Sequence, residues 1–165
     1  MQKNHKPLPA DIHQKVFRDW RYFLGFGFGS GLLPKIPGTW GSLVAIPLIV
    51  LFKLFPVWLY IVLTIAYFFL GAWLSEKLSR DLDMHDYGGV NCDEILGMLC
   101  VMLPFSLNIF NLTAGFILFR IFDILKPFPV GWIDKNIDGG MGMMLDDVAA
   151  AFLSICALWI LHLWI

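Results

Sequence analysis

Carboxylates stand where long apolar runs begin or end: Asp93, Glu94, Asp123, Asp146 and Asp147. Residues 95–119 and 148–165 contain no Asp, Glu, Lys or Arg, and residues 41–74 contain only Lys53. A carboxylate at the edge of hydrocarbon costs free energy unless it is paired, solvated or bound to a cation. Acids placed in this way predict a metal-using polar site on one face of a membrane.

The acids suggest which metal this site would use. Asp93 and Glu94 open one apolar run, and Asp146 and Asp147 open another. Helix N-capping, with a favourable charge near a helix N-terminus, accounts well for one of Asp146 and Asp147 but poorly for both. Hard oxygen donors without a His or Cys cluster suit Mg²⁺ rather than zinc. Because Mg²⁺ is commonly held by a few carboxylates together with substrate phosphate, the acids indicate phosphate chemistry.

Cationic side chains occur in the segment RIFDILKP, residues 120–127. Asp123 and Lys126 are three residues apart and Arg120 is one turn earlier, so on a helix all three would share a stripe. One interpretation is a helix end whose cations reach interfacial water and pair with the acid. The other is that Arg120 and Lys126 bind a phosphate group, and this segment alone leaves both open.

A further candidate phosphate contact is PGTWGS, residues 37–42. Its glycines, Gly38 and Gly41, could expose backbone N–H groups, and Thr39 and Ser42 offer hydroxyl groups. A tight turn that enters the membrane is an equally good interpretation. The segment matches neither GxxxxGK[ST] nor GxGxxG, so it predicts no nucleotide site.

The elements that carry these residues are typical of an all-α integral membrane protein. The chain of 165 residues is 58% hydrophobic and 15% charged, with a mean hydropathy of +0.71, and a soluble domain of this size could not keep so much apolar surface out of water. The apolar runs predict helical hairpins at 41–74 and 95–121 and a final span at 147–165. We expect a single domain, a compact bundle of about five membrane elements.

The N-terminal part of the chain has a different character. Residues 1–24 combine basic side chains with Val16, Trp20, Phe23 and Leu24 at helical spacing, which predicts an amphipathic helix on the membrane surface. Residues 25–42 are apolar but rich in Gly and Pro, and they predict an irregular loop that lines a cavity or is buried in protein.

Charge asymmetry orients the bundle. Apart from Lys53, every Lys and Arg lies before residue 41 or within 75–94 and 120–147. These segments share one side if each hairpin crosses and returns, and the positive-inside rule places that side in the cytoplasm. We therefore expect a multi-pass protein whose site faces the cytoplasm. The net charge of −1 and the lack of a basic tract argue against nucleic acid as a partner, and oligomeric state stays open.

With these segments identified, the chain resembles the phosphatidylglycerophosphatase A family. The stretches that carry the resemblance are GFGSGLLPKIPGTWGSL (27–43), HDYGGVNCDEILGM (85–98), FRIFDILKPFPVGWIDKN (119–136) and GGMGMMLDDVAA (139–150). The resemblance implies a Mg²⁺-dependent phosphatase of the bacterial inner membrane. It would convert phosphatidylglycerophosphate into phosphatidylglycerol and inorganic phosphate during phospholipid biosynthesis.

The resemblance also implies roles for individual residues. The family's acidic pattern falls on the five carboxylates already named, its lysine on Lys126, and its GTxGS loop on Gly38, Thr39, Gly41 and Ser42. Asp86 matches a further acid of the family. Asn91 and Cys92 depart from the pattern, because the family usually has apolar residues there.

A mechanism can be stated from these roles. Asp93, Glu94, Asp123, Asp146 and Asp147 would hold or position Mg²⁺, and an uncoordinated carboxylate would act as general base. Asp93, Asp123, Asp146 and Lys126 form the expected catalytic set, while Gly38, Thr39, Ser42, Arg120 and Lys126 would bind the substrate. A competing route has Asp123 as nucleophile in an aspartyl-phosphate intermediate.

Two other functions fit the composition. One is a phosphatase of other lipid phosphates. The other is a small membrane transport protein in which the acids bind a permeating cation, but this predicts acids along a path at mid-membrane depth.

Overall fold

The computed structural model describes residues 11–83 and 87–164, and these residues form helices and no strand. This confirms the all-helical class. In chain order the helices are α1 (Ile12–Arg18), α2 (Trp20–Gly25), the short 3₁₀ helix η1 (Ser30–Leu32), α3 (Pro37–Lys53), α4 (Val57–Leu82), α5 (Cys92–Met102), α6 (Ile109–Leu125), α7 (Val130–Asn136) and α8 (Gly139–His162). Asp86 and residues 1–10 of the predicted surface helix lie outside the described residues.

The short helix α5 forms the centre of the bundle. Nearly all its side chains from Ile95 to Met102 are buried, and α3, α4, α6 and α8 pack around it. At Gly97 the helix is close enough to α6 that the ring of Phe119 would overlap with any added Cβ atom. Helix α5, which the other helices enclose, carries Asp93 and Glu94 in its first turn.

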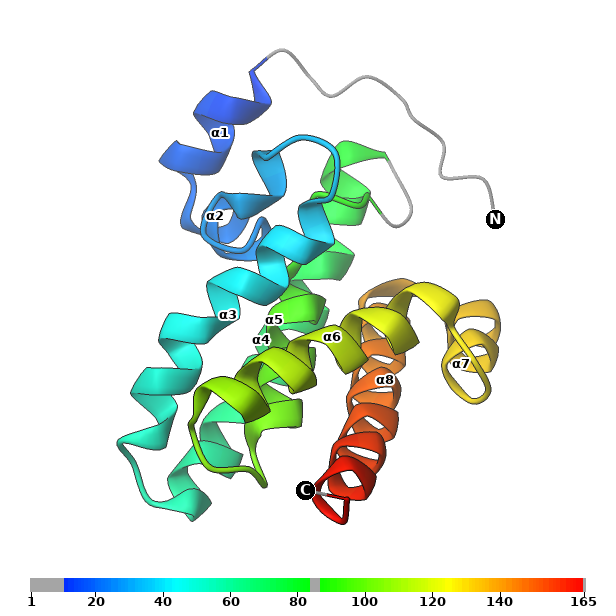
Figure 1. The fold of residues 1–165 in the computed structure, drawn as a ribbon. Helices are drawn as coiled ribbons and strands as arrows, with labels where there is room; N and C mark the ends of the chain where they lie inside the picture. The colour runs from blue at the N-terminus through cyan, green and yellow to red at the C-terminus, as the bar shows by residue number, and fades with distance from the viewer. Residues whose placement is uncertain (1–10, 84–86, 165) are drawn as a thin grey trace.

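The predicted hairpins correspond to the helix pairs α3–α4 and α5–α6, with different ends. Helix α4 continues to Leu82, well beyond the expected boundary at residue 74, and α6 continues to Leu125. Helices α4 and α8 are long and apolar enough to cross a membrane, whereas α3 is apolar but shorter. Figure 1 shows the α3–α4 turn and the end of α8 at the far end of the molecule from α1 and α2.

The expectation of an irregular loop over residues 25–42 is wrong for its last part. Helix α3 begins at Pro37, so residues 37–42 form its first turns. Proline suits the first position of a helix because its missing N–H would have no partner there. Gly38 and Gly41 each make the helix less stable than alanine would, by about 1 kcal/mol. Both glycines are buried, so packing offsets this cost.

Helix α8 begins eight residues before the predicted span at 147–165. It starts at Gly139, and Asp146 and Asp147 lie in its third turn. The first turn of α8 packs closely against α4 at Gly140, where a Cβ atom would overlap with the carbonyl oxygen of Ala72. The N-capping interpretation of Asp146 and Asp147 is therefore wrong, since neither lies at the helix terminus.

The N-terminal segment contains two short helices in place of one continuous helix. The chain turns at Asp19, whose carboxylate accepts a hydrogen bond from the backbone N–H of Arg21 at 3.0 Å and pairs with its guanidinium. This hydrogen-bonded ion pair holds the pKa of Asp19 down to about 2. Val16 is buried, whereas Phe17 and Trp20 are 68% and 58% exposed.

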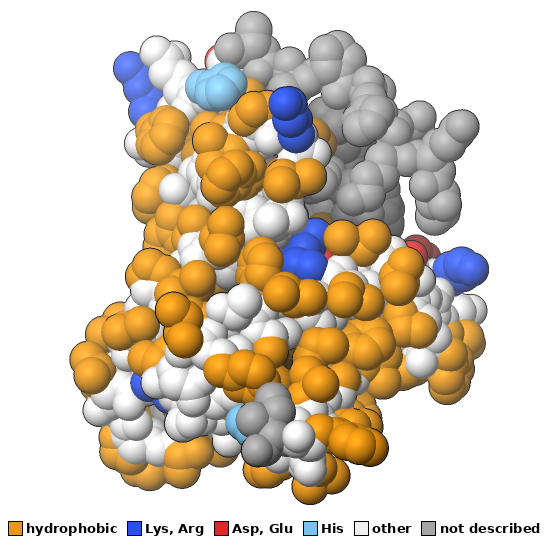
Figure 2. Space-filling view, in the orientation of Figure 1, with side chains coloured by type: hydrophobic (Ala, Val, Ile, Leu, Met, Phe, Trp, Pro, Cys, Tyr) orange, Lys and Arg blue, Asp and Glu red, His pale blue; other side chains and the backbone are white. Residues whose placement is uncertain are grey.

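The outer surface of the bundle is largely apolar. Large hydrophobic side chains of α3, α4, α6 and α8 are exposed along most of their length. Figure 2 shows hydrophobic side chains over most of this face, with charged groups mainly near its upper end and middle. Apolar surface of this extent is typical of a protein that contacts lipid.

Candidate functional site

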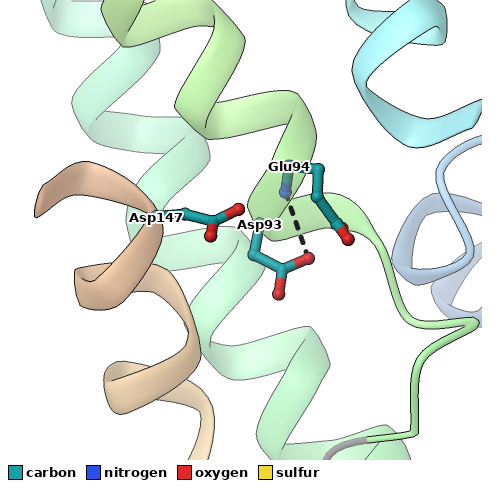
Figure 3. Close-up of side chains that lie close together, drawn as sticks. All are labelled: Asp93, Glu94 and Asp147. Atoms are coloured by element: carbon teal, nitrogen blue, oxygen red, sulfur yellow. Dashed lines mark hydrogen bonds between the residues drawn. The ribbon is translucent and has the colours of Figure 1, made fainter. Parts of the chain in front are cut away.

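Carboxylates from two helices meet at one end of the bundle. Ligand oxygens of Asp93, Glu94 and Asp147 all lie within 4.8 Å of one another. Figure 3 shows Asp147 on α8 pointing across to Asp93 at the start of α5, with the Glu94 carboxylate on the other side of Asp93. The backbone N–H of Glu94 donates to Oδ1 of Asp93 at 3.1 Å, which fixes the Asp93 side chain over the first turn.

This arrangement has the properties of a divalent cation site. Oε2 of Glu94 and Oδ2 of Asp147 are buried and have no hydrogen-bond partner within the described part of the chain. Burial raises the pKa of Glu94, against the lowering effects of its hydrogen-bonded neighbour Asp93 and of Arg120. Like charges this close are costly without a compensating cation. The residues therefore fit Mg²⁺, which takes carboxylate oxygens.

An ion pair on α6 lies next to the three carboxylates. Nη1 of Arg120 is 2.7 Å from Oδ2 of Asp123, one turn later, and 3.9 Å from Oε1 of Glu94. Both side chains of the α6 pair are mostly buried, at 16% and 14% exposed. Nε of Arg120 is buried without a hydrogen-bond partner among the described residues. The guanidinium thus retains donor capacity for an anionic ligand.

The spacing predicted that Lys126 would share a helical stripe with Arg120 and Asp123, and this prediction is wrong. Helix α6 ends at Leu125, and Lys126 takes a left-handed conformation with φ of 45°. Its ammonium group contacts Asp134 on α7 and donates to Oδ2 of Asp146 on α8 at 2.7 Å. Burial alone would lower the pKa of Lys126, but the two carboxylates outweigh it and raise the pKa, so the side chain stays charged.

The start of α3 closes another side of the site. A Cβ atom at Gly38 would overlap with Oε1 of Glu94 and lie 3.1 Å from the terminal nitrogens of Arg120. Thr39 is partly exposed beside it. Ser42 is fully buried and its hydroxyl donates to the carbonyl oxygen of Gly38 at 2.9 Å. In this arrangement Gly38 borders the site, whereas the Ser42 hydroxyl is used inside the helix.

The five predicted acids therefore fall into two kinds of environment. Asp93, Glu94 and Asp147 form the three-carboxylate cluster. Asp123 and Asp146 each pair with a cation beside that cluster, and both are close enough to repel Asp147 electrostatically.

Some residues around the site were not predicted from the sequence. Asp134 partners Lys126, and Glu76 on α4 accepts the N–H of Gly140 at 2.9 Å at the start of α8. Asn91 is fully buried and donates through Nδ2 to Ser30 Oγ and to the carbonyl oxygen of Pro37, both at 3.0 Å. The one sequence signal for this last contact was the departure from an apolar residue at position 91.

The chain is similar to known proteins over most of its length. The family model described as Phosphatidylglycerophosphatase A matches residues 23–162. Phosphatidylglycerophosphatase A of Escherichia coli K12 is 39% identical over 97% of this chain and 93% of the relative. Phosphatidylglycerophosphatase A of Haemophilus influenzae is 39% identical over 87% of this chain and 89% of its own length.

A third relative has a different name. A Bacteroides thetaiotaomicron protein with the provisional name phosphatidylinositol-3-phosphatase is 39% identical over 79% of this chain and 86% of its own length. No solved structure matches the chain. The family match spans all the segments that build the site, from the start of α3 to α8. The chain belongs to the phosphatidylglycerophosphatase A family.

Proposed function

We propose that this protein is a phosphatase that hydrolyses phosphatidylglycerophosphate to phosphatidylglycerol and inorganic phosphate. The observation that carries the proposal is the three-carboxylate cluster of Asp93, Glu94 and Asp147, set beside the cations Arg120 and Lys126. Acids and cations at one end of an apolar bundle suit a phosphate head group whose acyl chains stay in lipid. Family membership supports the same reaction.

Mg²⁺ is the metal that this donor set suits best. Asp93, Glu94 and Asp147 would hold it, because two of their buried oxygens have no hydrogen-bond partner in the described residues. When bound, the metal would neutralise phosphate charge and lower the pKa of a water molecule. The protein's own part is to keep the ligand oxygens together and to exclude bulk water from them.

The cations would bind and orient the phosphate. Arg120 has a buried Nε without a partner in the described chain, so it can donate to a phosphate oxygen while it keeps its ion pair with Asp123. Lys126 lies between Asp134 and Asp146 and would add positive charge as the phosphate approaches. Gly38 leaves room for the phosphate-binding groups, and Thr39 offers a hydroxyl next to them.

Asp146 is our candidate for the general base. It is 8% exposed and lies outside the three-carboxylate cluster. In direct hydrolysis it would take a proton from the attacking water as the new P–O bond forms and the bond to the glycerol oxygen breaks. The departing glycerol oxygen then takes up a proton to give the hydroxyl of phosphatidylglycerol.

A covalent route through Asp123 competes with direct hydrolysis. Asp123 would attack phosphorus, and water would then cleave the aspartyl-phosphate. The ion pair with Arg120 holds this carboxylate in a fixed position, which either route can use. Rapid quench with ³²P-labelled substrate separates them: a phosphoenzyme that forms and decays at the turnover rate would contradict direct hydrolysis.

The location follows from the same features. We infer a multi-pass protein of the bacterial inner membrane, in which α4 and α8 cross the bilayer and the site faces the cytoplasm. The exposed apolar surface and the charge asymmetry of the sequence support this orientation. A transport role is less well supported, because the acids cluster at one end of the bundle and do not follow a path along it.

A substrate panel tests the proposed reaction. Phosphate release should be measured from phosphatidylglycerophosphate, phosphatidate, lysophosphatidate and phosphatidylinositol-3-phosphate, each with and without Mg²⁺. The proposal predicts the highest kcat/KM with phosphatidylglycerophosphate and loss of turnover without the metal. A higher kcat/KM for the inositol lipid would instead favour the alternative that the third relative's name suggests.

A further inference from the structure

Asn91 joins three segments of the chain to the start of α5. Its side chain is fully buried, and its Nδ2 donates to Ser30 Oγ of η1 and to the carbonyl oxygen of Pro37 in α3, both at 3.0 Å. Its backbone N–H donates to the carbonyl oxygen of Gly25, at the end of α2, at 3.1 Å. One residue therefore connects α2, η1 and α3 to the helix that carries two acids of the three-carboxylate cluster.

The side chain of Asn91 does not make the hydrogen bond that its position favours. Asn91 lies at the N-cap of α5, where an Asn side chain normally accepts a hydrogen bond from an N–H group of its own helix. Here the side chain caps none of the described N–H groups of α5. The carbonyl oxygen of Pro37 can only accept a hydrogen bond, so it fixes Nδ2 toward α3. The amide is therefore used between segments and not within its own helix.

Two glycines leave the space that this amide occupies. A Cβ atom at Gly41 of α3 would lie 2.8 Å from Nδ2 of Asn91, and a Cβ atom at Gly27 would overlap with Oδ1. Oδ1 is buried and has no hydrogen-bond partner in the described part of the chain. An unpartnered buried oxygen costs free energy of the same order as a hydrogen bond contributes, so it offsets part of what the two bonds of Nδ2 add. The amide therefore holds geometry more than it stabilises the fold.

The bond to Pro37 acts on the site through the next residue. A Cβ atom at Gly38 would overlap with Oε1 of Glu94 and lie 3.1 Å from the terminal nitrogens of Arg120. Glu94 itself lies three residues after Asn91, in the first turn of α5 (Figure 3). The start of α5 thus holds both sides of this contact, Pro37 through a hydrogen bond and Glu94 through the chain. Movement of α3 away from Asn91 would loosen the packing of Gly38 against Glu94 and Arg120.

We propose that Asn91 is a positioning residue, which holds the first turn of α3 at the distance that keeps Glu94 and Arg120 in place. It is itself fully buried and acts through Pro37 and Gly38. The inference rests on the proposed function and adds how the metal-binding and phosphate-binding groups are held together. A residue that served only the fold would change the melting temperature without changing the affinity of the site for Mg²⁺.

Asn91→Leu tests the proposal, because it removes both bonds of Nδ2 and keeps a side chain of similar size. The first measurement is the Mg²⁺ concentration that gives half of the Mg²⁺-induced rise in melting temperature, in detergent and without substrate. The second is kcat/KM for phosphatidylglycerophosphate. We expect the Mg²⁺ concentration to increase by about fivefold or more and kcat/KM to fall by about tenfold. Unchanged values of both quantities would overturn the positioning role.

Two matched variants separate positioning from a general loss of stability. Ser30→Ala removes one bond of Nδ2 and leaves the bond to Pro37, so both quantities should stay within about twofold of the wild type. Asn111→Leu removes another buried Asn, in the first turn of α6, whose Nδ2 donates to the carbonyl oxygen of Ser106 at 2.9 Å. It should lower the melting temperature without changing the half-saturating Mg²⁺ concentration. An equal increase of that concentration in Asn111→Leu and Asn91→Leu would contradict the proposal.

Gly41→Ala tests the same contact if Asn91→Leu does not fold. Its Cβ atom would lie 2.8 Å from Nδ2 and displace the amide from Pro37, while alanine favours a helix more than glycine does. The half-saturating Mg²⁺ concentration should again increase, and an unchanged value would overturn the proposal. If the wild-type protein neither bound Mg²⁺ nor released phosphate from phosphatidylglycerophosphate, the proposed function would fail instead, which is a distinguishable outcome.

Discussion

At the scale of single residues, the site combines a carboxylate cluster with two ion pairs that share its border. Arg120 with Asp123 and Lys126 with Asp146 each join an acid to a cation at 2.7 Å. The left-handed backbone of Lys126 is a conformation that non-glycine residues adopt at a cost of about 1 kcal/mol or more. The two ion pairs of Lys126, with Asp134 and Asp146, offset this cost.

Gly38 provides the sharpest test of the close approach between α3 and the site. A Cβ atom in Gly38→Ala would displace Glu94 and Arg120, so we expect kcat/KM to fall by about tenfold or more, equal to about 1.4 kcal/mol of transition-state stabilisation. Gly25→Ala is the control, since its Cβ would meet only the flexible end of Leu78. Unchanged kinetics in Gly38→Ala would show that this contact does not shape the site.

The pair of Lys126 and Asp146 allows catalysis to be separated from stability. Lys126→Gln leaves Asp146 largely buried without its partner, so we expect unfolding free energy to drop by about 2 kcal/mol, less than for a fully buried pair because Lys126 is 32% exposed. Adding Asp146→Asn should restore much of the stability but no turnover. Thermal unfolding in detergent and phosphate release measure the two effects. Recovery of activity in the double variant would exclude a catalytic role for Asp146.

At the scale of elements, glycine and proline gave the least reliable predictions. PGTWGS was predicted to be irregular but begins α3, and the final span predicted from residue 147 begins at Gly139, in the glycine-rich start of α8. Their glycines lie against Glu94, Asn91 and Ala72, and tertiary packing of this kind cannot be inferred from local sequence. By contrast, the acidic pair at the start of α5 was located correctly, because an abrupt change from charged to apolar residues is a local signal.

The far end of the bundle should contribute to stability without affecting catalysis. Lys53 donates to the carbonyl oxygens of Leu103 and Phe105 at 3.1 and 2.7 Å, which joins the α3–α4 hairpin to the end of α5. Lys53→Met removes both bonds, so we expect a loss of about 1–3 kcal/mol in unfolding free energy. The kcat of the folded fraction should stay unchanged. A lower kcat with an unaltered melting temperature would show that this end of the bundle is coupled to the site.

At the scale of the whole molecule, the charged groups and the apolar surface support the membrane orientation that we propose. The acids, Arg120 and Lys126 gather at the start of α5, the end of α6 and the first turns of α8. Figure 1 shows the α3–α4 turn and the end of α8 at the far end of the molecule from α1 and α2. The sequence predicted this polarity from its Lys and Arg distribution. It could not predict that α5 would be enclosed by four other helices, because that depends on contacts between distant segments.

Cysteine accessibility tests the orientation. In a Cys156→Ser background, Lys135→Cys on α7 should react with a membrane-impermeant maleimide only from the cytoplasmic side, and Ser106→Cys between α5 and α6 only from the opposite side. Both positions are exposed on the protein, so reactivity reports on the membrane side alone. Labelling of the two positions from the same side would contradict the proposed topology.

The most direct test of the central claim is the Mg²⁺ dependence of phosphate release from phosphatidylglycerophosphate by the wild-type protein and by Asp147→Asn. The wild type should show a saturable requirement for Mg²⁺ and lose turnover in a chelator. Asp147→Asn removes a buried ligand oxygen of the three-carboxylate cluster, so turnover should fall by at least about a hundredfold while the protein still inserts into membranes. Full turnover in the chelator, or near-normal turnover of Asp147→Asn, would contradict a metal-dependent site built on Asp93, Glu94 and Asp147.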